Sequence, residues 1–128
     1  MTKTAFLFAG QGAQYLGMGR DLYDHYPIVK ETIDQASQVL GYDLRDLIDK
    51  EETKLNQTRY TQPAILATSV AIYRLLKEKG YQPDMVAGLS LGEYSALVAS
   101  GALDFEDAVA LVAKRGAYME EAAPAGSG

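Results

Sequence analysis

Two short apolar runs, each stopped by a glycine, interrupt an otherwise amphipathic chain. The first covers residues 4–9 and stops at Gly10, and the second covers residues 85–87 and stops at Gly88. Apolar runs of this length with flanking glycines are typical of buried strands. We therefore predict one strand near the N-terminus and a second about two thirds of the way along the chain.

The rest of the chain carries apolar residues mostly at helical spacing. Pro27 and Pro63 suit the first turn of a helix, while Gly41 and Gly80 suit the position just after its end. Asp104 suits an N-cap. These signals predict four helices, over residues 27–40, 63–79, 91–99 and 105–122.

Shorter helical turns are expected before Tyr26 and around Leu44 to Ile48, and the polar residues 51–60 are interpreted as a loop. The resulting order of strand, helices, strand, helices predicts an α/β fold with a parallel sheet. Two strands are too few for a stable sheet. We therefore expect either further strands or a larger protein of which this chain is a part.

Composition narrows the possible functions. The chain has 128 residues, 48% of them hydrophobic, which indicates one globular domain. The net charge is −5 and no basic block occurs, so nucleic acid is not an expected partner. Without cysteine and with one histidine, no metal site is expected. No apolar stretch approaches the roughly 20 residues of a membrane span, and we expect a cytoplasmic protein.

The second strand leads directly into the segment "GLSLGEY", residues 88–94. Its first five residues match the Gly-x-Ser-x-Gly nucleophile elbow, in which a serine stands between a strand and a helix. Ser90 is then a candidate nucleophile, and the N–H of Leu91 can stabilise an oxyanion at the helix N-terminus. The alternative, a plain strand-to-helix turn with Ser90 as N-cap, stays open on this pattern alone.

The first strand also leads into a glycine-rich segment, "GQGAQY", residues 10–15. It is not a dinucleotide-binding fingerprint, because Tyr15 stands where the third glycine belongs, and it is not a P-loop, because Met18 follows Gly17 where lysine is needed. The segment can supply a second backbone N–H donor at the sheet edge. An ordinary turn is the alternative.

Four segments together resemble one family. "FLFAGQGAQYLGMG", "YTQPAI", "GLSLGEYSALVASGAL" and "KRGAYM" follow the order and spacing of the malonyl-CoA:acyl carrier protein transacylases of bacterial fatty-acid synthesis. The resemblance implies a partial α/β-hydrolase-like acyltransferase core, with parallel strands and helices on both faces. Residues 1–122 would belong to this core. Residues 123–128 would lead toward a smaller ferredoxin-like subdomain that is absent here, as are the C-terminal strands.

The resemblance also implies residue roles. Ser90 would attack the thioester and carry the malonyl group, while the backbone N–H groups of Gln11 and Leu91 would form the oxyanion hole. Arg115 would bind the malonyl carboxylate, and Gln62 would line the pocket. The alternatives are an exposed helix arginine and a helix-start glutamine.

The implied reaction is a ping-pong transfer from malonyl-CoA to the phosphopantetheine thiol of acyl carrier protein. No metal and no cofactor is expected beyond these substrates. Two other functions stay open: a serine esterase or lipase, which shares the elbow but leaves Arg115 and the glycine loop unexplained, and a non-catalytic interaction fragment.

Two positions depart from the family pattern. Leu89 stands where the family has a histidine before the nucleophile, and no histidine follows Ser90 to act as general base. His25 lies far upstream and is expected to be a surface residue. We therefore expect an N-terminal part of a longer enzyme that is inactive in isolation and needs its missing half, or another copy, as a partner.

Overall fold

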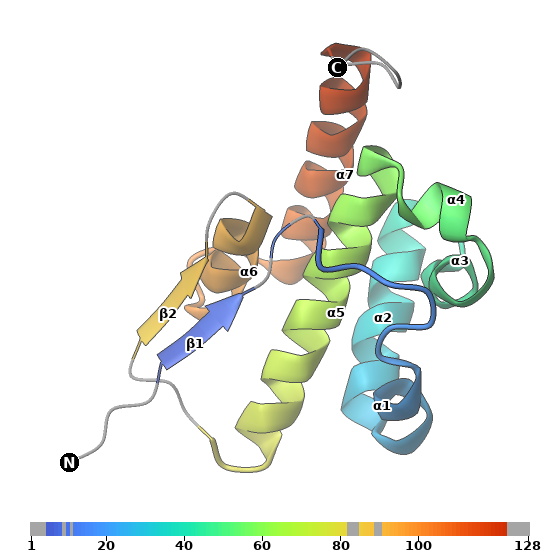
Figure 1. Cartoon of the computed structure of the whole chain (residues 1–128). Coiled ribbons are helices and arrows are strands. Elements are labelled where there is room, and N and C mark those ends of the chain that lie inside the picture. Colours follow the sequence, from blue (N-terminus) through green and yellow to red (C-terminus); the bar gives the residue numbers. More distant parts are fainter. Residues whose placement is uncertain (1–4, 9, 11, 82–84, 89–90, 123–128) are drawn as a thin grey trace.

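The computed structural model describes residues 5–8, 10, 12–81, 85–88 and 91–122. The order of elements along the chain is the predicted one of strand, helices, strand, helices (Figure 1). The elements are β1 (Ala5–Phe8), α1 (Arg20–His25), α2 (Pro27–Leu40), α3 (Leu44–Lys50), α4 (Glu52–Leu55), α5 (Thr58–Glu78), β2 (Met85–Gly88), α6 (Leu91–Ala99) and α7 (Phe105–Ala122).

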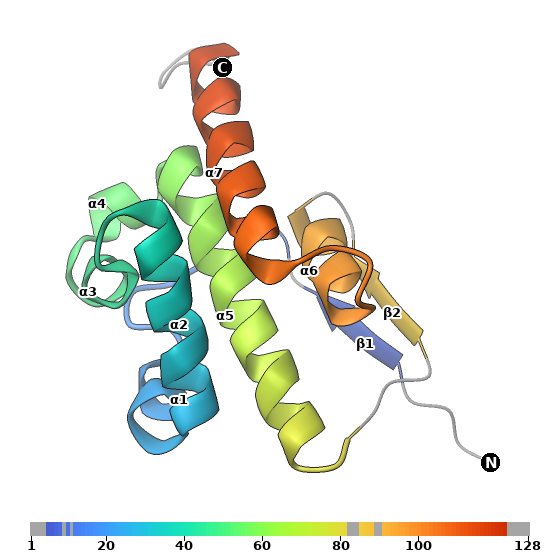
Figure 2. The ribbon, with the colours of Figure 1, turned by 180° about the vertical axis from the view of Figure 1, so that it is seen from behind.

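The two strands pair in parallel, with Ala5 opposite Met85 and Phe8 opposite Gly88. Helix α6 contacts both strands. It lies behind them in Figure 1 and in front of them in Figure 2, and so covers one face of the pair. The parallel pairing agrees with the prediction. The larger core, with helices on both faces, stays a prediction.

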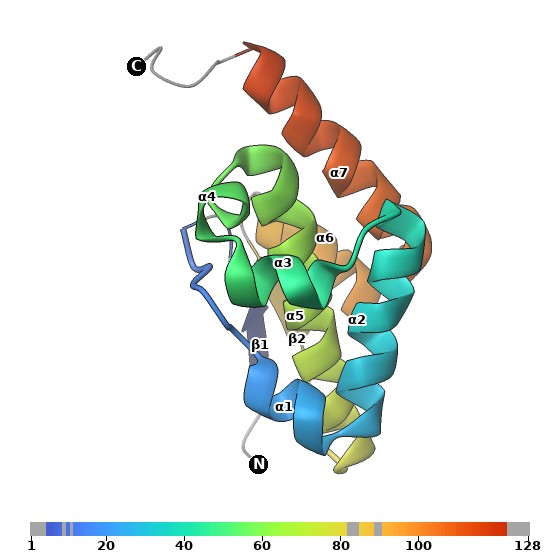
Figure 3. The same ribbon diagram turned by 90° about the vertical axis from the view of Figure 1, so that its right-hand side faces the viewer.

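Helix α5 is the centre of the helical part. It packs against α2, α6 and α7, and Figure 3 shows it behind α3 with α2 and α7 to its right. One line of apolar residues along α5, Ala64, Ala67, Ala71 and Leu75, is buried. Its alanine side chains let neighbouring helices approach closely, so this line forms the packed face of α5.

Several helix ends lie where local signals placed them. Helix α2 begins at Pro27, and Gly41 follows its last residue with a φ of 81°. Gly80, just beyond α5, has a φ of 95°. Glycine adopts this left-handed conformation without the steric cost that a Cβ would add. The bounds predicted for α2, α6 and α7 are confirmed.

The start of α5 corrects the prediction. The helix begins at Thr58, so Pro63 lies inside it rather than in its first turn, and residues 52–55 form α4 where a loop was expected. The N–H of Arg59 donates to the Glu120 carboxylate of α7, at 2.9 Å. A side chain from a distant helix thus satisfies a first-turn donor, which a local pattern cannot reveal.

Helix α3 offers a direct test of capping. The Asp43 carboxylate accepts a hydrogen bond from the N–H of Asp46 at 3.0 Å. We expect Asp43→Ala to lower the free energy of unfolding by about 1 kcal/mol, because an orphan helix donor loses its acceptor. Asp43→Asn, which keeps an acceptor, should stay close to the parent in urea unfolding. Equal losses in both variants would contradict the capping role.

Candidate functional site

Two predicted site segments leave the sheet at one edge. Because Phe8 pairs with Gly88 at the carboxyl ends of parallel strands, the glycine loop after β1 and the helix after β2 both start there. Ligands of open α/β sheets bind at this edge. Gln11 and Ser90 lie outside the described residues, so their roles as oxyanion donor and nucleophile stay predictions.

Leu91 is the first residue of α6, and its side chain is buried. The first N–H groups of a helix have no acceptor within that helix, and together with the helix dipole they favour negative charge. The position of Leu91 therefore suits the predicted oxyanion donor, directly after Ser90 in the chain. The role itself stays a prediction.

Arg115 and Gln62 are in direct contact. Arg115 Nη1 donates to Gln62 Oε1 at 2.9 Å, across 53 positions of sequence. Gln62 is only 1% exposed, and its Nε2 donates to Met119 Sδ at 3.1 Å. The packing of α5 on α7 thus brings together the residue predicted to line the pocket and the residue predicted to bind the malonyl carboxylate. Arg115 is partly buried, which argues against an exposed helix arginine.

A third residue of this cluster is Tyr94, which the sequence analysis did not single out. The Arg115 guanidinium carbon lies 5.5 Å from the centre of the Tyr94 ring, within the range of a cation–π contact. Tyr94 belongs to α6 and is partly buried. The signal in the sequence was its place four residues after Ser90, within the segment predicted to form a helix.

Gly116, next to Arg115, is where α7 meets the backbone of α5. A Cβ added at Gly116 would lie 2.8 Å from both Arg59 Cα and the Thr58 carbonyl oxygen. The Arg59 and Glu120 side chains join the same two helices, with 2.6 Å between Nε and Oε2. Burial raises the pKa of the Glu120 carboxyl, but the Arg59 hydrogen bonds outweigh it and lower this pKa overall.

We expect Gly116→Ala to destabilise the protein, although alanine is the better helix former. Helix propensity alone would add roughly 1 kcal/mol of stability. The new Cβ would instead push α7 away from α5, at a cost of about 1–3 kcal/mol or more. Thermal and urea unfolding measure the difference, with exposed Lys114→Ala as the control. A stabilised Gly116→Ala variant would contradict the close helix contact.

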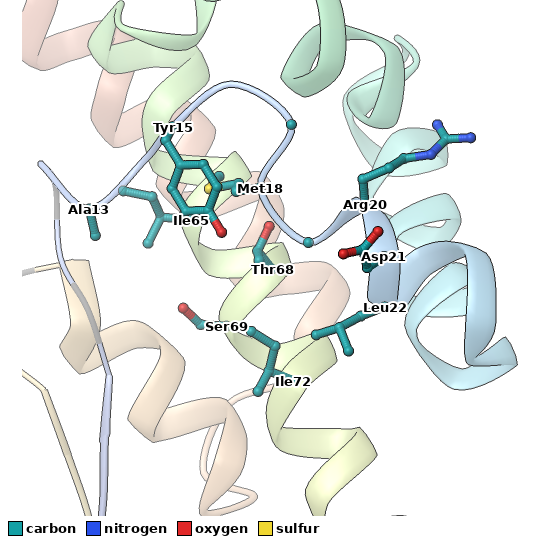
Figure 4. Close-up of a pocket in the computed structure, with 12 residues that line it drawn as sticks. Ala13, Tyr15, Met18, Arg20, Asp21, Leu22, Ile65, Thr68, Ser69 and Ile72 are labelled. Carbon is teal, nitrogen blue, oxygen red and sulfur yellow. The ribbon is translucent and has the colours of Figure 1, made fainter.

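A pocket of about 550 Å³ lies between the glycine-rich segment and α5 (Figure 4). Thr68 Oγ1, on its α5 wall, is buried and has no hydrogen-bond partner among the described residues. Ile72 also lines the pocket and is 38% exposed. Gln62, Leu91 and Arg115 do not line it.

His25 is exposed at the end of α1, and its Nδ1 lies 2.7 Å from the Asp21 carbonyl oxygen. The prediction of a surface histidine is confirmed. In the part of the chain that the structure describes, no group of three or more histidine, cysteine, aspartate or glutamate residues is placed to hold a metal ion. No helix within those residues has the length and apolarity needed to cross a membrane.

Comparison of this sequence with known protein families identifies the family of the chain. The acyl transferase domain model matches residues 5–128. The chain belongs to the acyl transferase domain family. This agrees with the resemblance carried by the four sequence segments, and the motif-based prediction of the family is confirmed.

Relatives of this acyl transferase domain are considerably longer. The malonyl CoA-acyl carrier protein transacylase of Bacillus subtilis is 52% identical over 129 residues, which cover 100% of this chain and 41% of the relative. The crystal structure of MCAT from Streptococcus pneumoniae has a TM-score of 0.94 and 94% identity, and the match covers 95% of this chain and 40% of that one. The chain therefore spans about two fifths of the length of these relatives.

A further solved structure is similar and contains a partner. The complex of a type II PKS acyl-carrier protein with its malonyl-transacylase, PlMCAT:AntF in the holo form, matches with a TM-score of 0.92 and 51% identity. The match covers 96% of this chain and 40% of that one. The structural neighbours are thus acyltransferases.

Proposed function

We propose that the full-length protein transfers a malonyl group from malonyl-CoA to the phosphopantetheine thiol of acyl carrier protein, in fatty acid synthesis. The observation that carries the proposal is the Arg115–Gln62 contact at 2.9 Å, beside the helix that begins directly after Ser90. The names of the relatives support it. The activity is proposed for the whole protein, since this chain spans 41% of the Bacillus subtilis relative.

The architecture proposed for the whole protein is an α/β-hydrolase-like core with helices on both faces of a parallel sheet. Residues 1–122 would form the N-terminal part of this core, and residues 123–128 would lead to a smaller subdomain. The parallel pairing of β1 with β2 and the likeness to solved acyltransferases support this assignment.

In the first half-reaction, Ser90 Oγ attacks the thioester carbonyl carbon of malonyl-CoA. The backbone N–H groups of Gln11 and Leu91 stabilise the oxyanion that forms. When the tetrahedral intermediate collapses, the carbon–sulfur bond breaks and the malonyl group remains on Ser90 as an ester. The serine proton passes through a histidine base, contributed by the rest of the protein, to the departing CoA thiolate. We expect residues 1–128 alone to be inactive.

In the second half-reaction, the pantetheine thiol of acyl carrier protein attacks the ester carbonyl carbon. The carbon–oxygen bond to Ser90 breaks, the malonyl group leaves as the pantetheine thioester, and the thiol proton passes through the base to Ser90 Oγ. The complex of a malonyl-transacylase with an acyl-carrier protein supports this partner. The chemistry uses a serine, a base and backbone donors, and the proposal includes no cofactor beyond the two substrates.

Arg115 gives this scheme its acyl preference. A guanidinium stays charged at every relevant pH and presents planar N–H donors that match a carboxylate at two points. Arg115 is partly buried, so its attraction for a carboxylate is screened less than at an open surface. Gln62 holds it from α5, and the neighbouring Gly116 lets α7 lie close to the α5 backbone.

The proposal is tested by incubating the full-length protein with malonyl-CoA and measuring its intact mass. We expect one malonyl group per chain, located by peptide mapping at Ser90 and removed by pantetheinylated acyl carrier protein. Acetyl-CoA under the same conditions should label far less. Release of free malonate without transfer would favour an esterase, and a protein that never gains mass would favour a non-catalytic interaction module.

A further inference from the structure

We propose that Tyr94 is a positioning residue that sets the acyl preference of the site, because its ring holds the Arg115 guanidinium where a malonyl carboxylate is bound. The inference rests on the proposed function and deepens it. It assigns Tyr94 a role in distinguishing acyl groups that carry a carboxylate from those that do not.

The Arg115 guanidinium is held by two different helices. From α5, Gln62 Oε1 accepts the hydrogen bond of Arg115 Nη1, at 2.9 Å. From α6, the Tyr94 ring lies 5.5 Å from the guanidinium carbon. A long arginine side chain has many rotamers, and contacts on separate helices reduce their number before substrate arrives.

The two contacts hold the guanidinium in different ways. Gln62 is nearly fully buried and its Nε2 donates to the Met119 sulfur, so packing and this hydrogen bond both restrict its amide. Tyr94 offers only a ring face, which attracts the cation without using an N–H donor in a hydrogen bond. A ring can therefore orient the guanidinium through its face, while hydrogen bonds to a guanidinium form in the plane of its N–H groups.

Tyr94 also links Arg115 to the nucleophile segment. It lies in the first turn of α6, which starts at Leu91, and it follows Ser90 by four positions. Malonyl must be held at two points, its carboxylate and its thioester, and Tyr94 contacts the residue proposed to bind the first. An acetyl group has no carboxylate and is held only at its thioester.

The test compares Tyr94→Leu with Tyr94→Phe in the full-length protein. We expect Tyr94→Leu to lower kcat/KM for malonyl-CoA by about 3- to 30-fold, the size of a cation–π contact. The value for acetyl-CoA should change by less than about twofold. Tyr94→Phe, which keeps the ring face, should behave like the parent. Tyr118→Leu makes the same chemical change at a side chain that is 68% exposed and serves as the matched control.

Two further variants keep the test decisive. Tyr94→Met keeps a long apolar side chain in α6, and we expect the same loss of malonyl preference from it even where Tyr94→Leu folds poorly. In an Arg115→Ala background, Tyr94→Leu should cause no further loss with malonyl-CoA, because the ring acts through the guanidinium. Additive losses in this double-mutant cycle would overturn the inference.

The outcomes separate this inference from the proposed function. Equal losses with malonyl-CoA and acetyl-CoA, or a Tyr94→Phe variant as impaired as Tyr94→Leu, would overturn the role of Tyr94 while Ser90 is still labelled by malonyl-CoA. Absence of any malonyl ester in the parent protein would overturn the proposed function, and this inference with it.

Discussion

Ser90→Ala in the full-length protein is expected to abolish the malonyl ester and to lower malonyl transfer by on the order of 10⁴-fold or more. Alanine leaves no oxygen to form the acyl-enzyme, so the reaction loses its covalent route. Transfer to pantetheinylated acyl carrier protein measures the rate, and intact mass measures the ester.

Ser100→Ala is a suitable control for this variant. Ser100 directly follows α6, and its hydroxyl donates to the Leu97 carbonyl at 3.0 Å, so its loss is a local change at an exposed position. We expect normal labelling from it. A malonyl ester that persists in Ser90→Ala, mapped to another residue, would refute Ser90 as the nucleophile.

The second large effect is expected from Arg115→Ala. Removing a two-point, charge-assisted contact with a carboxylate should lower kcat/KM for malonyl-CoA by at least about a hundredfold. The value for acetyl-CoA should stay within a few-fold, since acetyl has no carboxylate. The ratio of the two kcat/KM values is the measurement, because a general loss of folded protein cannot change it.

Two neighbouring changes sharpen this prediction. Arg115→Lys keeps the charge but not the planar donor pair, and we expect it to recover only part of the malonyl activity. Lys114→Ala removes an exposed charge one position away and should leave the ratio unchanged. If Arg115→Ala slowed malonyl and acetyl transfer equally, the carboxylate-binding role would be wrong.

Where the sequence predicted element ends correctly, the signals were local. Pro27 and Gly41 mark the two ends of α2 through their own φ preferences. The same kind of signal placed Gly80 after α5. The start of α5 was missed because its first turn depends on Glu120, which reaches Arg59 from α7. A contact between residues 61 positions apart leaves no local pattern.

The sequence predicted some features of the candidate site and missed others. The motifs predicted Gln62 and Arg115 as site residues, and the structure brings them into contact. The sequence did not predict that Gly116 would set the spacing of the two helices, or that Tyr94 would lie against the guanidinium. Both features depend on how three helices meet, and helix spacing alone does not specify which faces meet.

The sequence by itself determined the family and the order of strands and helices, and it predicted which residues a malonyl group would meet. Those properties depend on residue types and on spacing within short segments, where backbone preferences act directly. Only the tertiary structure decided that Arg115 is held between Gln62 and Tyr94. Side chains from α5, α6 and α7 come within contact distance because burial of their apolar faces packs these helices together, and that packing is a property of the whole chain.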